Sequence, residues 1–404
     1  AMIVLCFAAC GKTDGDKSST GKAANVKVGF IFLHDENSTY DKNFITAAEE
    51  ACKKAGVEIL KKTNISETQA CYDAAAELVD EGCNVIFADS FGHEPYVIQA
   101  AKKFPEVQFL HATGTKAHTE GLSNYHNAFA SIYEGRYLAG VAAGMKLNEM
   151  ISSGKITADK AKMGYVGAYT YAEVISGYTS FYLGAKSVCP SVTMEVTFTG
   201  SWYDETAEKE AAQKLINNGC VLISQHADSM GAPTACEAAG VPNVSYNGST
   251  VSACPNTFIV SSRIDWAPYL EYAIDCVKNG KAIDTDWTGT LSTGSVVLTD
   301  VNTKAAAEGT QAKIDEVKAE LESGKLHVFD TSAFTVTVSD SKNKNATVDA
   351  DGHLTGYKAD IDSDADNTGD TEVVSDGYFH ESEKRSAPCF DVQIDGITLL
   401  DTKF

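Results

Sequence analysis

The sequence predicts an α/β protein of two similar lobes, each built on a doubly wound parallel sheet, with a multi-strand hinge between them and a β-rich C-terminal tail. The main observation is a repeat, because residues 77–86 read ELVDEGCNVI and residues 214–223 read KLINNGCVLI. Each segment is the end of an apolar-periodic helix, a glycine, a cysteine and then an apolar strand. A β-α-β-α-β run recurs around both segments, over roughly 27–90 and 163–227. Two such lobes predict a cleft between them, which is a common place for a small molecule to bind.

The composition agrees with two domains and argues against some partners. The chain has 404 residues, which is long enough for two domains that each bury a core. Its net charge of −22 argues against nucleic acid and against an anionic membrane surface as the main partner. The same charge also favours solubility, so it does not identify a ligand. We expect the protein to be a monomer.

The first ten residues, AMIVLCFAAC, are similar to the end of a lipoprotein signal peptide. An apolar run that ends in small residues before a cysteine predicts that Cys10 is acylated and anchors the protein to a membrane. A fragment of buried helix is the alternative. Residues 11–25 are polar and rich in glycine and serine, which is the composition of a flexible tether. Since no other segment approaches the ~20 apolar residues that span a bilayer, we expect attachment through the lipid only.

The first lobe is predicted from strands and helices that alternate along the chain. Strand 26–32 is followed by helix 41–55, which carries Phe44 and Cys52 on one face and ends at Gly56. The elements expected after it are strand 57–61, helix 67–81, strand 84–90, helix 95–103 and strand 107–112. Because these strands are almost continuously apolar, they favour a parallel sheet that is covered on both faces.

The second lobe repeats this alternation. Helix 132–148 begins it, and the elements expected after it are strand 163–168, helix 173–186, strand 193–199, helix 206–218, strand 221–225, helix 229–239 and strand 243–247. Residues 258–266 then form a strand that we expect to return toward the first lobe. Helix 268–279 and strand 293–299 lie near further crossings, and helix 303–323 would complete the first lobe.

These elements divide the chain into segments. The expected segments are a truncated signal with its anchor cysteine over 1–10, a tether over 11–25, a first lobe over 26–128 plus 250–325, a second lobe over 129–249, and an acidic, β-rich extension over 326–404. The expected hinge crossings lie near 125–130, 248–258 and 280–292. In the extension, residues 360–371 alternate aspartates as a calcium loop does. Ala365 and Thr371 replace the glycine and glutamate of that loop, so we predict no metal site.

Sequence motifs of catalysis are missing. No G-x-G-x-x-G follows the first strand, and no P-loop or G-x-S-x-G motif occurs. His226, Asp228 and Ser229 are close in sequence, but residues at one strand end do not form a catalytic triad. The strand ends carry aromatic, amide, hydroxyl and carboxylate groups instead. This mixture favours recognition of a ligand, so we predict a binding protein without a cofactor.

The candidate ligand-binding residues follow the carboxyl ends of the strands, where open α/β sheets bind their ligands. They are Tyr40, Asp41, Ser90, Phe91, Gly92, His111, Thr113, Glu173, Trp202, Asp204, Gln225, His226, Asp228, Asn247 and Asp265. An aromatic ring from each lobe can hold a flat ligand between them, and Tyr40 and Trp202 are the candidates. For each ring the alternative is packing in a core. Trp202 stands at a strand-to-helix turn, where a core tryptophan is less expected.

Four stretches together resemble a known family. They are SFGHEPYVIQAAKKFPEVQFLHATG (90–114), YEGRYLAGVAAGMK (133–146), GSWYDETAEKEAAQKLINNGC (200–220) and QHADS (225–229). The chain resembles, over roughly 26–325, the basic membrane protein (BMP) family of ABC-transporter solute-binding lipoproteins, which have the type I periplasmic-binding-protein fold. The resemblance implies a purine ligand that is passed to an ABC permease and ATPase from the outer face of the cell membrane.

The resemblance also implies roles for single residues. Tyr40 and Trp202 match the positions that stack on purines, and Asp204 matches the turn aspartate. The family often has an aspartate that holds ribose hydroxyls where this chain has Asn247. The departure favours a free base, with adenine first and a nucleoside as the second possibility.

Other functions stay open at this stage. A receptor that presents its ligand to a membrane sensor would share the two lobes and the cleft. A sugar or another small solute is a further ligand class. An amino-acid ligand needs a basic partner for its carboxylate, and Arg263 is the only obvious candidate near the cleft.

Overall fold

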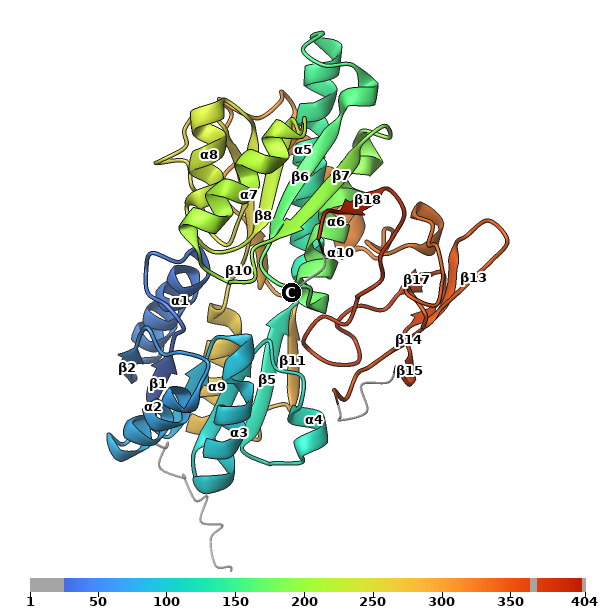
Figure 1. Cartoon of the computed structure of the whole chain (residues 1–404). Coiled ribbons are helices and arrows are strands. Elements are labelled where there is room, and N and C mark those ends of the chain that lie inside the picture. The colour runs from blue at the N-terminus through green and yellow to red at the C-terminus, as the bar shows by residue number, and fades with distance from the viewer. Residues whose placement is uncertain (1–24, 364–368, 402–404) are drawn as a thin grey trace, which may run out of the picture.

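The structure is a computed structural model that describes residues 25–363 and 369–401 (Figure 1). The predicted anchor Cys10 and all but the last residue of the predicted tether lie outside the described residues.

The first lobe is a six-stranded parallel sheet with helices on both faces (Figure 1). The strand order is β11-β5-β4-β3-β1-β2. The strands are β1 (Lys27–Ile31), β2 (Glu58–Lys62), β3 (Val85–Ala88), β4 (Gln108–Ala112), β5 (Tyr125–Ala130) and β11 (Asp286–Gly289). The helices are α1 (Thr39–Ala55), α2 (Gln69–Asp80), η1 (Phe91–His93), α3 (Glu94–Lys103), α4 (Ala117–Glu120) and α9 (Ala267–Lys278).

The second lobe is a seven-stranded sheet in the order β12-β10-β9-β8-β6-β7-β18, in which β12 runs antiparallel to β10. Its strands are β6 (Lys162–Gly167), β7 (Thr193–Phe198), β8 (Leu222–His226), β9 (Asn243–Tyr246), β10 (Phe258–Ile264), β12 (Val296–Leu298) and β18 (Ile397–Leu399). Its helices are α5 (Ile132–Ser152), η2 (Ala158–Lys160), α6 (Ala172–Val188), α7 (Glu205–Asn217), α8 (Gly231–Ala239) and α10 (Thr310–Glu322).

The predicted fold class is confirmed, but the lobe boundaries need a correction. The sequence analysis assigned 250–325 to the first lobe, whereas β10 pairs with β9 in the second sheet and α10 packs against α5. The chain therefore crosses between the lobes after β5, after β10 and between β11 and β12. The expected crossing near 248–258 is wrong, because the polypeptide stays in the second lobe until Ile264.

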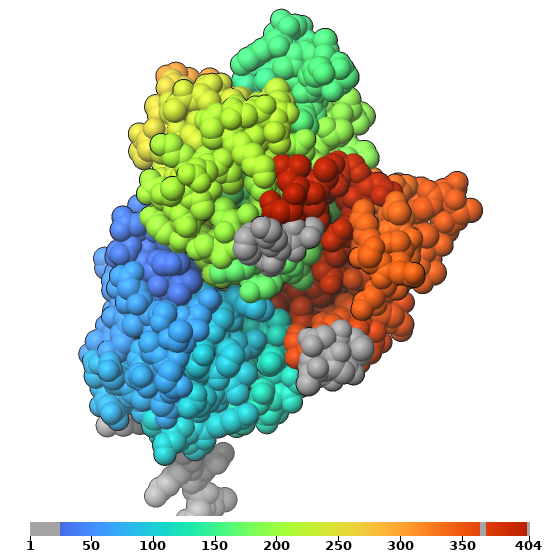
Figure 2. Space-filling model, in the orientation of Figure 1, coloured from blue at the N-terminus to red at the C-terminus, as the bar shows by residue number. Residues whose placement is uncertain are grey.

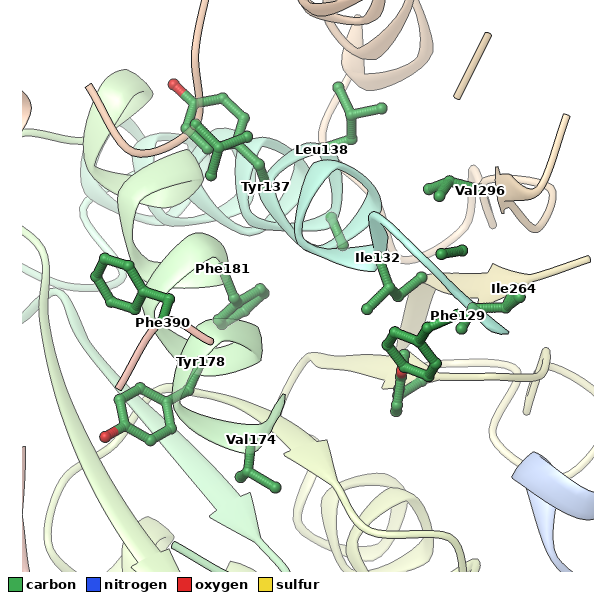
Figure 3. Close-up of a cluster of buried hydrophobic side chains, with 14 of the residues drawn as sticks. Phe129, Ile132, Tyr137, Leu138, Val174, Tyr178, Phe181, Ile264, Val296 and Phe390 are labelled. Atoms are coloured by element: carbon green, nitrogen blue, oxygen red, sulfur yellow. The ribbon is translucent and has the colours of Figure 1, made fainter. Parts of the chain in front are cut away.

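The closest helix packing is that of α5 on α6, and two glycines allow it. A Cβ atom on Gly140 would overlap the carbonyl oxygen of Phe181, and one on Gly184 would overlap that of Tyr137. The buried side chains around this contact run on toward the crossings, through Phe129 and Ile264 (Figure 3). One apolar core thus joins the hinge to the second lobe.

The described residues from about 326 onward form a β-rich extension beside both lobes (Figures 1 and 2). Its elements are η3 (Thr331–Ala333), β13 (Ala346–Val348), β14 (Leu354–Ala359), β15 (Thr371–Glu372), β16 (Val374–Ser375), β17 (Tyr378–Phe379) and the strand β18 named above. Its strand β18 pairs with the second lobe, where it lies parallel to β7. The extension also reaches the first lobe, because the backbone N–H and the hydroxyl of Ser386 donate to Asp286 Oδ1 over 2.9 and 2.8 Å.

None of the helices in the described part of the chain is long and apolar enough to cross a membrane.

Candidate ligand-binding site

A cavity of about 380 Å³ lies between the lobes, at the carboxyl ends of both sheets. We call it the inner cavity. Its lining residues are Leu33, Tyr40, Asp41, Asp89, Ser90, Phe91, Thr113, Glu173, Trp202, His226, Asp228 and Tyr246.

Nine of the fifteen candidate residues from the sequence line this cavity. They are Tyr40, Asp41, Ser90, Phe91, Thr113, Glu173, Trp202, His226 and Asp228. The structure brings them together because the loops after parallel strands leave each sheet at the same edge. Their contact with a ligand stays a prediction.

The other six candidates do not line the inner cavity. Asp204 is exposed and caps α7 by accepting a hydrogen bond from Ala207 N over 2.9 Å. Gln225 accepts from Asn243 Nδ2 over 2.8 Å inside the second sheet, and His111 Nε2 lies 2.7 Å from Ser90 O. Gly92 donates its backbone N–H to Glu67 beside the cavity.

Asn247 and Asp265 line a separate groove that also contains Arg263. Both polar atoms of the buried Asn247 amide lack a hydrogen-bond partner among the described residues. Asp265 accepts from Ala267 N over 3.0 Å at the start of α9.

The list of candidate residues left out three lining residues, Leu33, Asp89 and Tyr246. Asp89 directly precedes Ser90 at the end of β3, and Tyr246 directly precedes Asn247 at the end of β9. Their position at a strand end was the signal that could have found them. The regular alternation of side chains stops where a strand ends. It therefore does not tell which residue of each pair, Asp89 or Ser90 and Tyr246 or Asn247, faces the cleft.

The first turn of α1 positions two of the lining residues. Ser38 caps this helix, and its hydroxyl donates to Asp41 Oδ2 over 2.6 Å. Asp41 Oδ1 also accepts from the backbone N–H of His34 over 2.9 Å, so the carboxylate is held from both sides. The first turn of α1 therefore holds Asp41 in place and carries Tyr40 next to it. The Tyr40 hydroxyl donates to Asp89 O over 2.6 Å.

Aromatic rings from both lobes surround the cavity. The Trp202 ring stands edge-on to Tyr169 at a centroid distance of 5.1 Å and lies 6.4 Å from the His226 ring. Phe91 of the first lobe contacts Tyr171 of the second at 4.9 Å. The backbone N–H of Thr39 also donates to Asp228 O over 2.9 Å, which joins the lobes directly. The two lobes are therefore in contact around the cavity.

The lining is rich in carboxyl groups. Burial raises the pKa of Asp89 and of Asp228 well above the usual range of a carboxyl group. Burial also pushes the pKa of Asp41 upward, but hydrogen bonds from His34 and Ser38 outweigh it and leave the pKa lowered. Among the residues that the structure describes, no lysine or arginine lines the cavity and His226 is its one basic residue, and burial lowers the pKa of His226. Such a lining disfavours an anionic ligand.

Four buried polar atoms of the lining lack a hydrogen-bond partner among the described residues. They are Asp89 Oδ2, Thr113 Oγ1, His226 Nδ1 and the Tyr246 hydroxyl oxygen. Buried polar groups in folded proteins are nearly always paired, so a cluster of unpaired ones calls for an explanation. A ligand with both donors and acceptors would pair them.

Comparison with known proteins decides the family. The family model of PnrA-like ABC transporter substrate-binding proteins (Bmp) matches residues 29–326. The chain belongs to this family. It is an ABC transporter solute-binding protein, not an enzyme, and the family works outside the cytoplasm with transporter components.

Individual relatives agree with the family and differ in the ligand they are named for. A purine-binding protein of Brucella abortus is 30% identical over 310 residues, which are 75% of this chain and 83% of the relative. An ABC transporter protein of Haloferax volcanii, named as glucose-binding, is 27% identical over 80% of this chain and 78% of its own length. A solved solute-binding protein of Conexibacter woesei shares the fold, with a TM-score of 0.62, 21% identity, and coverage of 75% of this chain and 98% of its own.

Proposed function

We propose that this protein captures a purine in the inner cavity and passes it to an ABC importer, with a free base such as adenine as the first candidate. The observation that carries the proposal is a set of buried polar atoms next to aromatic rings that have no partner in the described part of the chain, in a cavity that no described lysine or arginine lines. The Brucella relative named as purine-binding supports it.

The chemistry of adenine matches this set. Asp89 Oδ2 would accept from the exocyclic amine, since a carboxylate only accepts hydrogen bonds and a protonated carboxyl can do both. The hydroxyls of Thr113 and Tyr246 would donate to ring nitrogens. The flat ring would lie between Tyr40 and Trp202, where stacking adds roughly 0.5–1.5 kcal/mol beyond the area buried.

The lining also argues against some purines. A nucleotide would bring its phosphate close to the Asp41 carboxylate, whose lowered pKa keeps it charged, and like charges at short range in a buried site are strongly unfavourable. The base-over-nucleoside preference rests on Asn247, which stands where the family often has the ribose-binding aspartate. A neutral amide makes weaker hydrogen bonds to hydroxyls than a carboxylate does.

Attachment to the membrane is part of the proposal. Cys10, acylated after signal cleavage, would hold the protein at the outer face of the membrane beside the permease. One acyl chain binds membranes only marginally, so stable attachment needs at least two. When the chain is expressed behind a complete signal, Cys10→Ser should move it to the soluble fraction. A variant that stays with the membranes would contradict the anchor.

A sugar is the second candidate, because the Haloferax relative is named as glucose-binding. Carboxylates that accept from hydroxyls and an aromatic ring that covers an apolar face are also features of sugar sites. The unpaired hydroxyl groups of Thr113 and Tyr246 fit either ligand.

A thermal-shift screen separates the two candidates. A ligand at a hundred times its Kd adds about 2.7 kcal/mol of stability, which is easily seen. We expect adenine to raise the melting temperature, and glucose, amino acids and AMP to leave it unchanged. A shift with glucose and none with any purine would replace the proposal with the sugar alternative.

A further inference from the structure

A second pocket lies where the extension meets two of the three crossings between the lobes. Its walls come from the start of α5, the end of β11, the end of α10 with the chain just after it, and residues within 378–383 of the extension. We call it the hinge pocket. It is larger than the inner cavity and shares no described lining residue with it, so the two are separate spaces. The family match ends at residue 326, and one wall is therefore made by a part of the chain that lies beyond it.

The lining of the hinge pocket is acidic. It carries the carboxyl groups of Glu134, Glu381 and Glu383 and no described lysine or arginine. Glu134 accepts a hydrogen bond from Leu291 N over 3.1 Å through Oε2, and its Oε1 has no partner in the described part of the chain. Burial raises the pKa of Glu134 to about 7, and the Glu322 carboxylate adds to the rise. A cation beside this carboxyl group would stabilise its charged form.

The neighbouring groups leave Glu134 without a counter-charge. Glu381 is used inside the extension, where its carboxylate accepts from three backbone N–H groups. Glu383 is exposed, and its Oε2 lies 2.7 Å from His380 Nδ1. Lys325 does not neutralise the pocket, because its ammonium donates to Glu320 Oε1 over 2.6 Å. Of the three carboxyl groups, Glu134 is thus the half-buried one that keeps an unused oxygen for a ligand.

Ser382 adds a buried polar atom without a partner. It lines the hinge pocket and is 5% exposed, and its Oγ has no hydrogen-bond partner among the described residues. Its φ of 60° is uncommon for a residue with a side chain, and such conformations concentrate at functional sites. Because buried polar groups are nearly always paired, a ligand hydroxyl or N–H group would complete this one.

Aromatic rings form the apolar part of the lining. The Tyr133 and Phe329 rings lie 5.4 Å apart, and the His327 and Tyr378 rings stack at 3.7 Å. The face of an aromatic ring attracts a cation. A bare metal ion is less suited, because the described residues contain no group of three or more His, Cys, Asp or Glu that could hold one. Rings, a carboxyl group without a counter-charge and an unpaired hydroxyl together favour an organic cation.

We propose that the hinge pocket binds a small organic ammonium ion. Its charge pairs with Glu134, its hydroxyl or N–H group pairs with Ser382, and its apolar part lies against the rings of Tyr133 and Phe329. This site is separate from the purine site and does not depend on it.

Calorimetry of the full chain tests the proposal with choline, ethanolamine and putrescine as probes. We expect at least one of them to bind, and the uncharged tert-butyl analogue of choline not to bind. Glu134→Gln removes the charge and should weaken the bound probe about tenfold or more, since charge-assisted hydrogen bonds are the stronger ones. Glu149→Gln is the matched control, because Glu149 lies near the other end of α5 and outside the pocket. It should leave the Kd of the probe unchanged.

A second pair of variants keeps the test independent of Glu134. Tyr133→Leu removes a ring and should weaken the probe several-fold, whereas Tyr133→Phe keeps the ring and should stay close to the wild type. A cooperative thermal transition shows that each variant is folded. The proposal is overturned if no probe binds, if the uncharged analogue binds as tightly as choline, or if folded Glu134→Gln or Tyr133→Leu binds the probe as the wild type does. These outcomes do not depend on adenine, so a failure of the proposed function is a separate result.

Discussion

Among single residues, Trp202 is expected to contribute most to the affinity for the ligand. It lines the inner cavity on the turn after β7, and its ring is held edge-on by Tyr169. We predict that Trp202→Ala weakens adenine binding about tenfold or more, because the ligand loses both the stacking energy and a buried apolar surface. Trp202→Phe retains an aromatic face and should stay within a few-fold of the wild type in calorimetry. Equal affinities for the alanine variant and the wild type would remove Trp202 from the site.

Glu208 gives a pH-dependent prediction. Its carboxylate lies on α7 and accepts from the Ser229 hydroxyl over 2.6 Å and from Ser229 N over 3.2 Å. Burial nevertheless raises the pKa of Glu208 from 4.5 to about 7. Since the folded protein keeps a proton that the unfolded chain has lost, stability should fall as pH rises from about 4.5 to about 7, by on the order of 3 kcal/mol.

Glu208→Gln should remove this part of the pH dependence. Denaturant unfolding at pH 5 and pH 8 measures it as a difference between variant and wild type. The pKa of Glu134 is raised in the same way, to about 7, and Glu134 is left unchanged in both proteins, so its contribution cancels. The same pH dependence in both proteins would show that Glu208 does not titrate as described.

At the scale of elements, the α5–α6 contact depends on small residues. Gly184→Ala places a Cβ atom on the carbonyl of Tyr137, and the two helices must move apart. We predict a loss of about 1–3 kcal/mol in the free energy of unfolding, which is the usual cost of overpacking. Ser187→Ala, at an exposed position of the same helix, should change stability by less than about 0.5 kcal/mol. A stable Gly184→Ala variant would mean that the helices can separate freely.

The elements also show how far sequence reasoning reaches. Helix and strand positions followed from periodicity and from stops such as Gly56, which ends α1 with a φ of 64°. The sheet to which β10 belongs did not follow, because an apolar strand carries no information about its partner. Strand β11, with the sequence DWTG, was not predicted as a strand at all. Its four residues are too few and too polar for a periodic pattern.

The position of the candidate site was predictable in outline from the predicted strand ends. Residues at strand ends converge by topology, and nine of them line the inner cavity. Asp204 was misplaced because an aspartate after a strand is equally suited to cap the next helix, which is what it does. The packing of the extension against both lobes was not predictable, since nothing in the sequence of 326–404 tells where that segment packs.

For the whole molecule, the three crossings predict hinge motion. Two separate sheets joined after β5, after β10 and between β11 and β12 can rotate as rigid bodies around a ligand. We expect small-angle scattering to give a smaller radius of gyration with saturating adenine than without it. The extension binds both lobes on one side and should limit the opening. An unchanged radius at saturation would contradict ligand-driven closure.

The central claim is that a purine ring occupies the inner cavity. A crystal structure of the full chain with adenine tests it most directly. The account predicts a flat ligand between Tyr40 and Trp202, with its exocyclic amine within hydrogen-bond distance of Asp89 Oδ2. Adenine bound in the groove of Asn247 and Asp265 would contradict the account. Glucose bound in the inner cavity, together with no binding of adenine, would contradict it as well.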